Sequence, residues 1–330
     1  MWDSQHQTRA IEPFQSLGIN IDIIDVDYRK KEIYDKLSGA KKTLSPKNIF
    51  SPSSANWKTA VDYIVKKYGK DVVVFHGEGA DSLHNHGFSQ DRPTDKISNY
   101  LFGPTFFRNI KKDKIYDYLL SFIFSDTRIP CKELDCPKYV KKAAFDNFKK
   151  WLRKEYFEET IKNINEKNLY FYFSYLYSQF HLQSPQIRMF KEGLKNVVMP
   201  YLDNQLKSFL YKMPENWGRG LNDNPTKYPI KVFAKKIFNK TQLESVTSLP
   251  HSYLSEVEYL NIFDEYLLKG ESYRFIKDTI NKVDIDKIFD DKIFNVDEIE
   301  KFVGQFNRGE LKDISKVDAN LITFLTFSEI

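Results

Sequence analysis

The stretch from residue 71 to residue 81, DVVVFHGEGAD, constrains the fold most, because an apolar run stops abruptly in a turn of glycines and carboxylates. Its consecutive β-branched and aromatic residues predict a strand buried on both faces, as in a parallel sheet. In open parallel sheets, ligands bind just beyond the carboxyl ends of the strands. Gly77 and Gly79 leave backbone amides accessible to a phosphate, and Glu78 and Asp81 place two carboxylates within one turn, which suits Mg²⁺. The stretch therefore predicts a strand that leads into a binding site.

Length and composition indicate a folded, helix-rich protein. A chain of 330 residues can bury a full core, either as one large domain or as two that share a cleft. Hydrophobic residues make up 41% of the chain and aromatic residues 15%, with only 13 Gly and 13 Pro, which argues against a disordered chain.

Charge and hydropathy bear on the partners of the chain. The net charge of +5 is small and lysines are interspersed with acids, so neither a nucleic-acid stripe nor a membrane-binding face is evident. No apolar run is long enough to span a bilayer, and the opening MWDSQH lacks the apolar core of a signal peptide. We therefore expect a cytoplasmic protein with no nucleic-acid or membrane partner.

The chain has two cysteines, Cys131 and Cys136. Two thiols at this spacing cannot complete a four-ligand zinc site without histidines from elsewhere, and a disulfide does not persist in a reducing cytosol. Both are expected to be free thiols.

The segments before residue 71 read as a parallel β/α layout, in which Gly18 and Gly69 end the first and last helices. The expected order is helix, strand, crossover helix and helix, over residues 1–18, 19–27, 28–37 and 57–68. Two strands are too few for a sheet that buries both faces, so we expect partner strands from an upstream portion or from another chain.

From about residue 93 onward the pattern becomes helical. Aromatic residues recur at helical spacing, which predicts helices over 115–124, 139–156, 157–168 and 169–180. The run YFYFSYLY at 170–177 is expected to pack between helices rather than to stack on bases. Beyond residue 240, segments such as 295–306 read as short amphipathic helices. The expected organisation is an α/β layer over residues 1–90 and a mainly helical remainder over residues 91–330.

Three short motifs carry a family resemblance. HGEGADSL at 76–83 resembles the Gly-Glu-Gly-Ala-Asp-Glu-Leu segment of the asparagine synthetase family, MPYLD at 199–203 resembles its Pro-Phe-Leu-Asp helix start, and PTKYPIK at 225–231 resembles its Lys-x-x-Leu-Arg segment. Their order and spacing also fit, over about residues 1–240. The resemblance implies an α/β fold with a parallel sheet of the ATP-pyrophosphatase type (adenine nucleotide alpha hydrolase-like) and a ligase that adenylates a carboxylate.

The resemblance also implies roles for individual residues. Asp81 would bind the Mg²⁺ that accompanies pyrophosphate, and Lys227 would contact the phosphates of ATP in the transition state. Glu78 would face the adenylate and orient or deprotonate the nitrogen nucleophile. Gly77 and Gly79 would let the backbone lie against the nucleotide. The implied cofactors are ATP and Mg²⁺, and the implied substrates are a small carboxylate and ammonia or an amine.

The sequence also departs from the family pattern. The family's Ser-Gly-Gly-x-Asp-Ser pyrophosphate loop and its glutaminase domain have no counterpart in the 330 residues, SLHNHG stands at 82–87 where the family has Glu-Leu-Phe-Gly-Gly-Tyr, and Asn196 and Val198 replace a Glu and an Arg. We therefore expect an altered acceptor pocket, and we expect the isolated chain to bind ATP·Mg²⁺ weakly or not at all. A late start codon or a split gene, with an upstream segment, a second subunit or a partner glutaminase completing the enzyme, is one explanation, and a non-catalytic binding paralogue is the other.

Other interpretations of the same residues stay open. Glu78 and Asp81 could simply cap a following helix, where acids are favoured. Together with His76, His84 and His86 they could form a metallohydrolase site, although His84 and His86, two residues apart, point in different directions on a strand or a helix. By analogy with the family, His181 and Arg188 are candidates for lining the cleft, and packing or helix-end roles fit them equally well.

Overall fold

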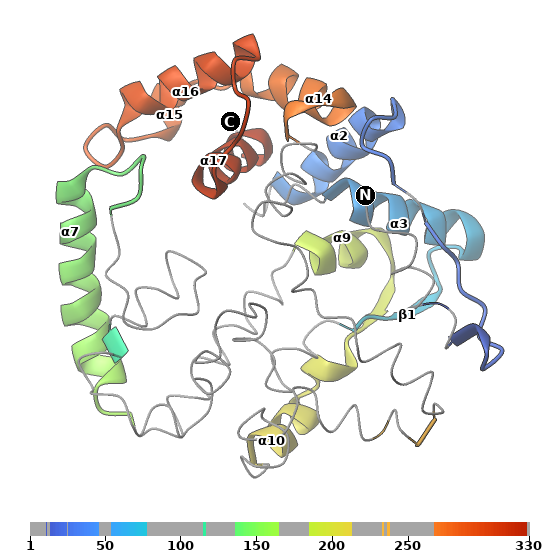
Figure 1. Ribbon diagram of the computed structural model, residues 1–330. Coiled ribbons are helices and arrows are strands. Elements are labelled where there is room, and N and C mark those ends of the chain that lie inside the picture. Colours follow the sequence, from blue (N-terminus) through green and yellow to red (C-terminus); the bar gives the residue numbers. More distant parts are fainter. Residues whose placement is uncertain are drawn as a thin grey trace.

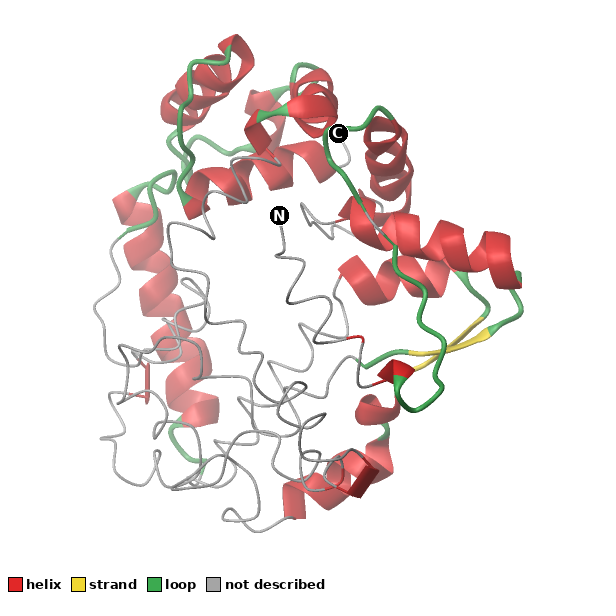
Figure 2. Cartoon of the chain, turned by 45° about the vertical axis from the view of Figure 1, so that its right-hand side comes forward, coloured by secondary structure: helices red, strands yellow, loops and turns green. Residues whose placement is uncertain are grey.

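The computed structural model describes residues 11, 14–24, 26–45, 54–77, 115–116, 136–164, 185–212, 233, 236–237 and 267–328. Over these residues the protein is mostly helical, with one two-stranded parallel sheet (Figures 1 and 2). The helices are α2 (Glu32–Leu44), α3 (Ser54–Tyr68), α7 (Lys142–Trp151), α9 (Pro185–Gly193), α10 (Asn204–Lys212), α14 (Gly270–Ile280), α15 (Ile285–Ile288), α16 (Val296–Arg308) and α17 (Lys316–Phe327). The strands are β1 (Val73–Phe75) and β2 (Asn196–Val198). No helix in these described ranges has the length and apolar character needed to cross a membrane.

The two strands pair in parallel, with Val73 opposite Asn196 and Phe75 opposite Val198. Their central residues, Val74 and Val197, pack against the hydrophobic core. The other face is open, and Phe75 is 72% exposed. Burial of β1 on both faces, which its apolar run predicts, is therefore wrong for these residues.

The strand expected over residues 19–27 is also wrong, since none of its described residues forms a strand. The carboxylate of Asp22 instead accepts hydrogen bonds from Lys67 Nζ at 2.6 Å and from Tyr68 Oη at 2.8 Å, which tether the segment to the last turn of α3. Ile23 is 62% exposed. An alternating pattern forms a strand only where a second strand supplies ladder hydrogen bonds, and the described residues offer this segment none.

The two helices around this segment follow their sequence patterns closely. In α2 the buried residues recur at helical spacing, and the helix begins and ends later than expected. The helix expected over 57–68 is confirmed as α3. It is followed by Gly69, which has φ 81° and whose amide donates to Val65 O at 3.0 Å. Gly18, with φ 74°, likewise ends the short turn before it. Asp62 of α3 accepts hydrogen bonds from Lys36 of α2 and from Lys58, which joins the two helices.

The segment from 142 to 161 is one continuous helical stretch rather than the two helices expected to meet at residue 157. It changes at Leu152 from α7 into a π-helix, Leu152–Ile161. Leu152, Phe157 and Ile161 are buried, and their spacings of five and four residues lie along one side of this wider helix. Of the helix expected over 115–124, residues 115 and 116 are helical, and the rest lies outside the described residues, as does the helix expected over 169–180.

The C-terminal helices complete the core behind α2. The amphipathic helix expected over 295–306 is confirmed as α16, which ends at Gly309 in the left-handed conformation with φ 69°. Helices α14 and α17 pack against each other and against α2. One hydrophobic cluster consequently extends from Tyr28 to Phe327. The ATP-pyrophosphatase layer expected over residues 1–90 stays a prediction, because 46–53 and 78–90 lie outside the described residues.

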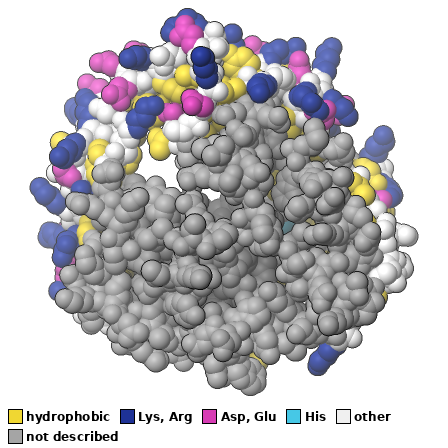
Figure 3. All heavy atoms as spheres, viewed as in Figure 1, with side chains coloured by type: hydrophobic (Ala, Val, Ile, Leu, Met, Phe, Trp, Pro, Cys, Tyr) yellow, Lys and Arg dark blue, Asp and Glu magenta, His cyan; other side chains and the backbone are white. Residues whose placement is uncertain are grey.

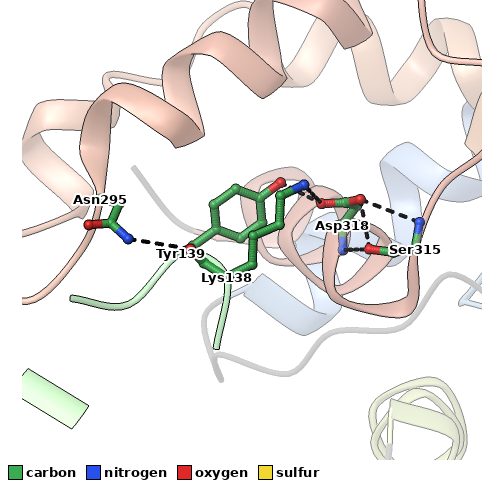
Figure 4. A network of polar contacts seen from close by, with 5 residues as sticks. All are labelled: Lys138, Tyr139, Asn295, Ser315 and Asp318. Carbon is green, nitrogen blue, oxygen red and sulfur yellow. Dashed lines mark hydrogen bonds and ion pairs between the residues drawn. The ribbon is translucent and has the colours of Figure 1, made fainter. Parts of the chain in front are cut away.

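A polar network joins the turn before α7 to the start of α17 (Figure 4). The carboxylate of Asp318 accepts hydrogen bonds from Lys138 Nζ at 2.8 Å, from Tyr139 Oη and from Ser315 Oγ at 2.7 Å. Ser315 and Asp318 form a capping box at the start of α17. Asn295, which precedes α16, donates to Lys138 O at 3.3 Å. Burial raises the pKa of Asp318, but the hydrogen bonds from Lys138, Tyr139 and Ser315 outweigh it and hold the pKa below its ordinary value of 3.8.

The variant Asp318→Asn should be less stable at pH 7 by about 1–3 kcal/mol, because it removes a charged acceptor from a buried network. The network of the natural protein contributes fully above the unfolded pKa of 3.8 and is lost as the pH falls through the lower folded pKa. Urea unfolding at pH 7 and pH 3.5 should therefore show a smaller difference between variant and natural protein in acid. An equal difference at both pH values would contradict this assignment. Tyr139→Phe, which keeps the carboxylate, is the matched control.

Candidate functional site

The parallel pairing of β1 and β2 brings two motifs that are distant in the sequence to one edge of the sheet. β1 leads into His76 and Gly77, and β2 leads into residues 199–203. The ladder continues past both strands, since the His76 amide donates to Val198 O at 2.8 Å. We call His76, Gly77 and residues 199–203 the carboxyl edge. It is where ligands of parallel sheets bind.

The helix start expected at residues 200–203 is confirmed. Pro200–Leu202 form one 3₁₀ turn, and Asp203 then caps α10. Its carboxylate accepts hydrogen bonds from Gln205 N at 2.8 Å and Leu206 N at 3.0 Å. The role of Asp203 in the structure is therefore to cap α10, and the residue marks where the chain turns after β2.

His76 links the carboxyl edge to α9. Its Nε2 lies 2.7 Å from Gln186 Nε2, and its ring packs edge-on against Phe190, with the ring centroids 5.2 Å apart. Phe190 is 7% exposed. Helix α9 packs in turn against α3. No local sequence signal identified Gln186 or Phe190 as neighbours of His76, because the contact joins residues about 110 positions apart in the chain.

Of the residues that the resemblance selected, Gly77 lies at the carboxyl edge and is exposed. The other four, Glu78, Gly79, Asp81 and Lys227, lie outside the described residues, so their roles stay predictions.

Among the remaining candidates, Arg188 of α9 pairs with Glu192 at 3.6 Å, one turn further along the same helix. Asn196 donates to Asp71 O at 3.2 Å at the amino end of the strands, and Val198, the last residue of β2, is exposed. His181 lies outside the described residues.

The metallohydrolase alternative gains no support from the described ranges, in which no three His, Cys, Asp or Glu side chains gather as metal ligands. Of its proposed set only His76 is described, and its Nε2 faces an amide. Cys136 is a free thiol that donates to Val140 O at 3.1 Å, and burial raises its pKa, which disfavours the nucleophilic thiolate. Among the described residues, Figure 3 shows basic side chains along the margin of this face with acidic ones between them.

Gly77 should tolerate a side chain as far as the fold is concerned. No atom of the described residues lies within 4 Å of a Cβ built at this position, and its φ lies outside the left-handed range. Gly77→Ala should therefore change the free energy of unfolding by less than about 1 kcal/mol, as measured by urea denaturation. If the backbone here lies against a nucleotide, the same variant should lose activity. A large loss of stability would show that the glycine serves the fold.

Comparison with known proteins found no matching family model, no matching curated protein and no matching solved structure.

Proposed function

We propose that the protein is an asparagine synthetase-like, ATP-dependent ligase that adenylates a small carboxylate and transfers the acyl group to ammonia or an amine. The observation that supports the proposal most is the parallel pairing of β1 and β2. It places the start of the Gly-Glu-Gly-Ala-Asp motif beside the Pro-Tyr-Leu-Asp turn, at the edge where a parallel sheet binds ligands. This adjacency supports the interpretation of the two motifs as parts of one site.

In the proposed reaction, a carboxylate oxygen of the substrate attacks the α-phosphorus of ATP, a P–O bond forms, and the bond to pyrophosphate breaks. Negative charge grows on the departing pyrophosphate, and the Lys227 ammonium would neutralise part of it. Mg²⁺ held by Asp81 would neutralise the rest. The space beside Gly77 in the described structure is compatible with close approach of the nucleotide.

In the second step the nitrogen nucleophile attacks the acyl carbon of the mixed anhydride, and AMP leaves with the electron pair of the broken C–O bond. Glu78 would orient the nucleophile and accept its proton. The amide, AMP, the pyrophosphate released in the first step and the proton taken from the nucleophile together balance the carboxylate, amine and ATP consumed.

The proposal is tested by product analysis on protein purified from its own cells with a C-terminal tag, so that any partner chain stays bound. ATP and Mg²⁺ are supplied with a panel of carboxylic acids, amino acids, ammonia and amines. We expect AMP and pyrophosphate in equal amounts, and only when a substrate carboxylate is present. Products of ADP and phosphate, hydrolysis that needs a transition metal and no nucleotide, or no nucleotide turnover with any substrate would contradict it.

A further inference from the structure

Two oppositely charged surfaces adjoin where the chain before α7 meets the C-terminal helices. Residues 138–154, which include α7, contain seven lysines and arginines and one aspartate. Residues 284–300, which include α15 and the start of α16, contain seven aspartates and glutamates and two lysines. We call these ranges the basic surface and the acidic surface.

Many of these charges lack an ion-pair partner. In the basic surface Lys141, Lys142 and Lys150 are exposed, and none of them pairs with a carboxylate in the described ranges. In the acidic surface all seven acidic side chains are exposed, and only Asp284 pairs with a cation of the described residues, Lys287 at 3.0 Å. Each surface therefore presents uncompensated charge of one sign to the solvent.

The backbone fixes the two surfaces side by side. Val140 and Phe294 form an antiparallel bridge, and Lys141 N donates to Ile293 O at 2.8 Å. Figure 1 shows α7 leading away from this junction on one side and α15 and α16 on the other. Ile293 lies at the junction itself, and its side chain is 43% exposed. The junction thus combines positive charge, negative charge and an exposed apolar side chain.

The combination of the two surfaces determines which partner fits. A nucleic acid or an anionic membrane would be attracted to the basic surface, but the acidic surface beside it would repel the same partner. A second copy of the chain carries both charges in the same arrangement, so it matches both surfaces at once.

We propose that this junction is the contact surface for a second copy of the chain. A twofold axis beside Ile293 places the basic surface of each copy against the acidic surface of the other, so one arrangement makes two identical attractive contacts. The Ile293 side chains of the two copies then meet near the axis, where burial of apolar surface adds to the attraction between charges. The inference does not depend on the proposed function.

Charge reversal in the full chain tests this geometry by analytical ultracentrifugation. Lys141→Glu with Lys142→Glu reverses the basic side of the junction, and Asp291→Lys with Glu298→Lys reverses the acidic side. We expect the natural chain to be a dimer, and each double variant to raise its dissociation constant at least about 100-fold, because like charges then face each other. An equimolar mixture of the two double variants should form a heterodimer of near-natural affinity, because each contact again joins opposite charges.

The control is Lys195→Glu, which reverses an exposed charge beside the strands and should leave the dimer unchanged. Raising the salt from about 0.05 M to about 0.5 M should weaken the natural dimer. Urea denaturation checks that each variant is folded, and where a double variant is not, Lys141→Glu and Asp291→Lys alone provide the same test. A natural chain that is monomeric at about 10 μM in low salt, or folded variants that dimerise like the natural chain or fail to associate with each other, would overturn the inference.

Discussion

Asp81→Asn and Lys227→Ala are each expected to lower pyrophosphate release by about 100- to 1,000-fold, the loss typical when one preorganised charge is removed from a transition state. Asp81→Asn would weaken the binding of Mg²⁺, and Lys227→Ala would remove the positive charge beside the phosphates. Neither substitution changes the substrate carboxylate. The effect should appear mainly in kcat, since charge on the departing pyrophosphate develops only as the reaction proceeds.

Two residues at the amino ends of β1 and β2 supply the matched control. Lys195 and Asp71 form an ion pair of 2.5 Å beside the amino ends of β2 and β1, and both are exposed. Asp71→Asn and Lys195→Ala make the same changes in charge at the opposite end of the sheet, and exposed pairs contribute only about 0–1 kcal/mol to stability. We expect both controls to retain near-natural rates. If the controls and the site variants lose activity equally, the carboxyl edge is not the reaction site.

Gly193→Ala is expected to lower the free energy of unfolding by about 1–3 kcal/mol or more, because overpacking forces neighbouring groups apart. The new Cβ would lie 2.2 Å from Val61 Cγ1, so α9 must move away from α3. Gln186 and Phe190 of α9 would move with the helix, so their contacts with His76 would be lost. The variant should therefore lose activity at temperatures at which it is still folded. Urea denaturation and pyrophosphate release on the same preparation measure both effects.

Removing the clashing methyl should restore the packing. In the double variant Gly193→Ala with Val61→Ala, the loss should be smaller than the sum of the two single losses, since the two residues are in contact. Gly304→Ala in α16 is the control, because its nearest neighbour is Arg308 Nη1 at 3.1 Å, the far end of a flexible side chain. This change should be neutral or stabilising by up to about 1 kcal/mol. Natural-like stability of Gly193→Ala would contradict the close packing of α9 on α3.

Local patterns in the sequence predicted the elements that depend on local chemistry. The apolar periodicity of α3 and α16, the left-handed exits at Gly18 and Gly69, and the strand after Asp71 are all present, and none of them needs knowledge of a distant residue. At residues 200–203 the sequence analysis had only the resemblance to a helix start, and the structure shows that Pro200 and Asp203 form the turn and the cap through contacts with the adjoining backbone.

Features that depend on a distant partner could not be predicted in the same way. The apolar alternation of residues 19–27 fits a strand, but the structure offers it the side chains of Lys67 and Tyr68 instead of a second strand. β2 has only three residues, too few for a periodic signal, and its pairing with β1 depends on tertiary packing. The contact between His76 and Gln186 could not be predicted for the same reason, and the sequence suggested His76 as a metal ligand or as a satisfied or solvent-facing histidine.

The most direct test of adenylation at the carboxyl edge is ATP–pyrophosphate exchange catalysed by the natural protein with its partners retained. Labelled pyrophosphate is supplied with ATP, Mg²⁺ and each carboxylic acid of the panel, without ammonia or amine. Because the proposed first step is reversible and needs no nitrogen donor, we predict label in ATP with at least one carboxylic acid and none without it. Label in ATP without any carboxylic acid, or no exchange with a carboxylic acid that supports amide formation, would contradict the account.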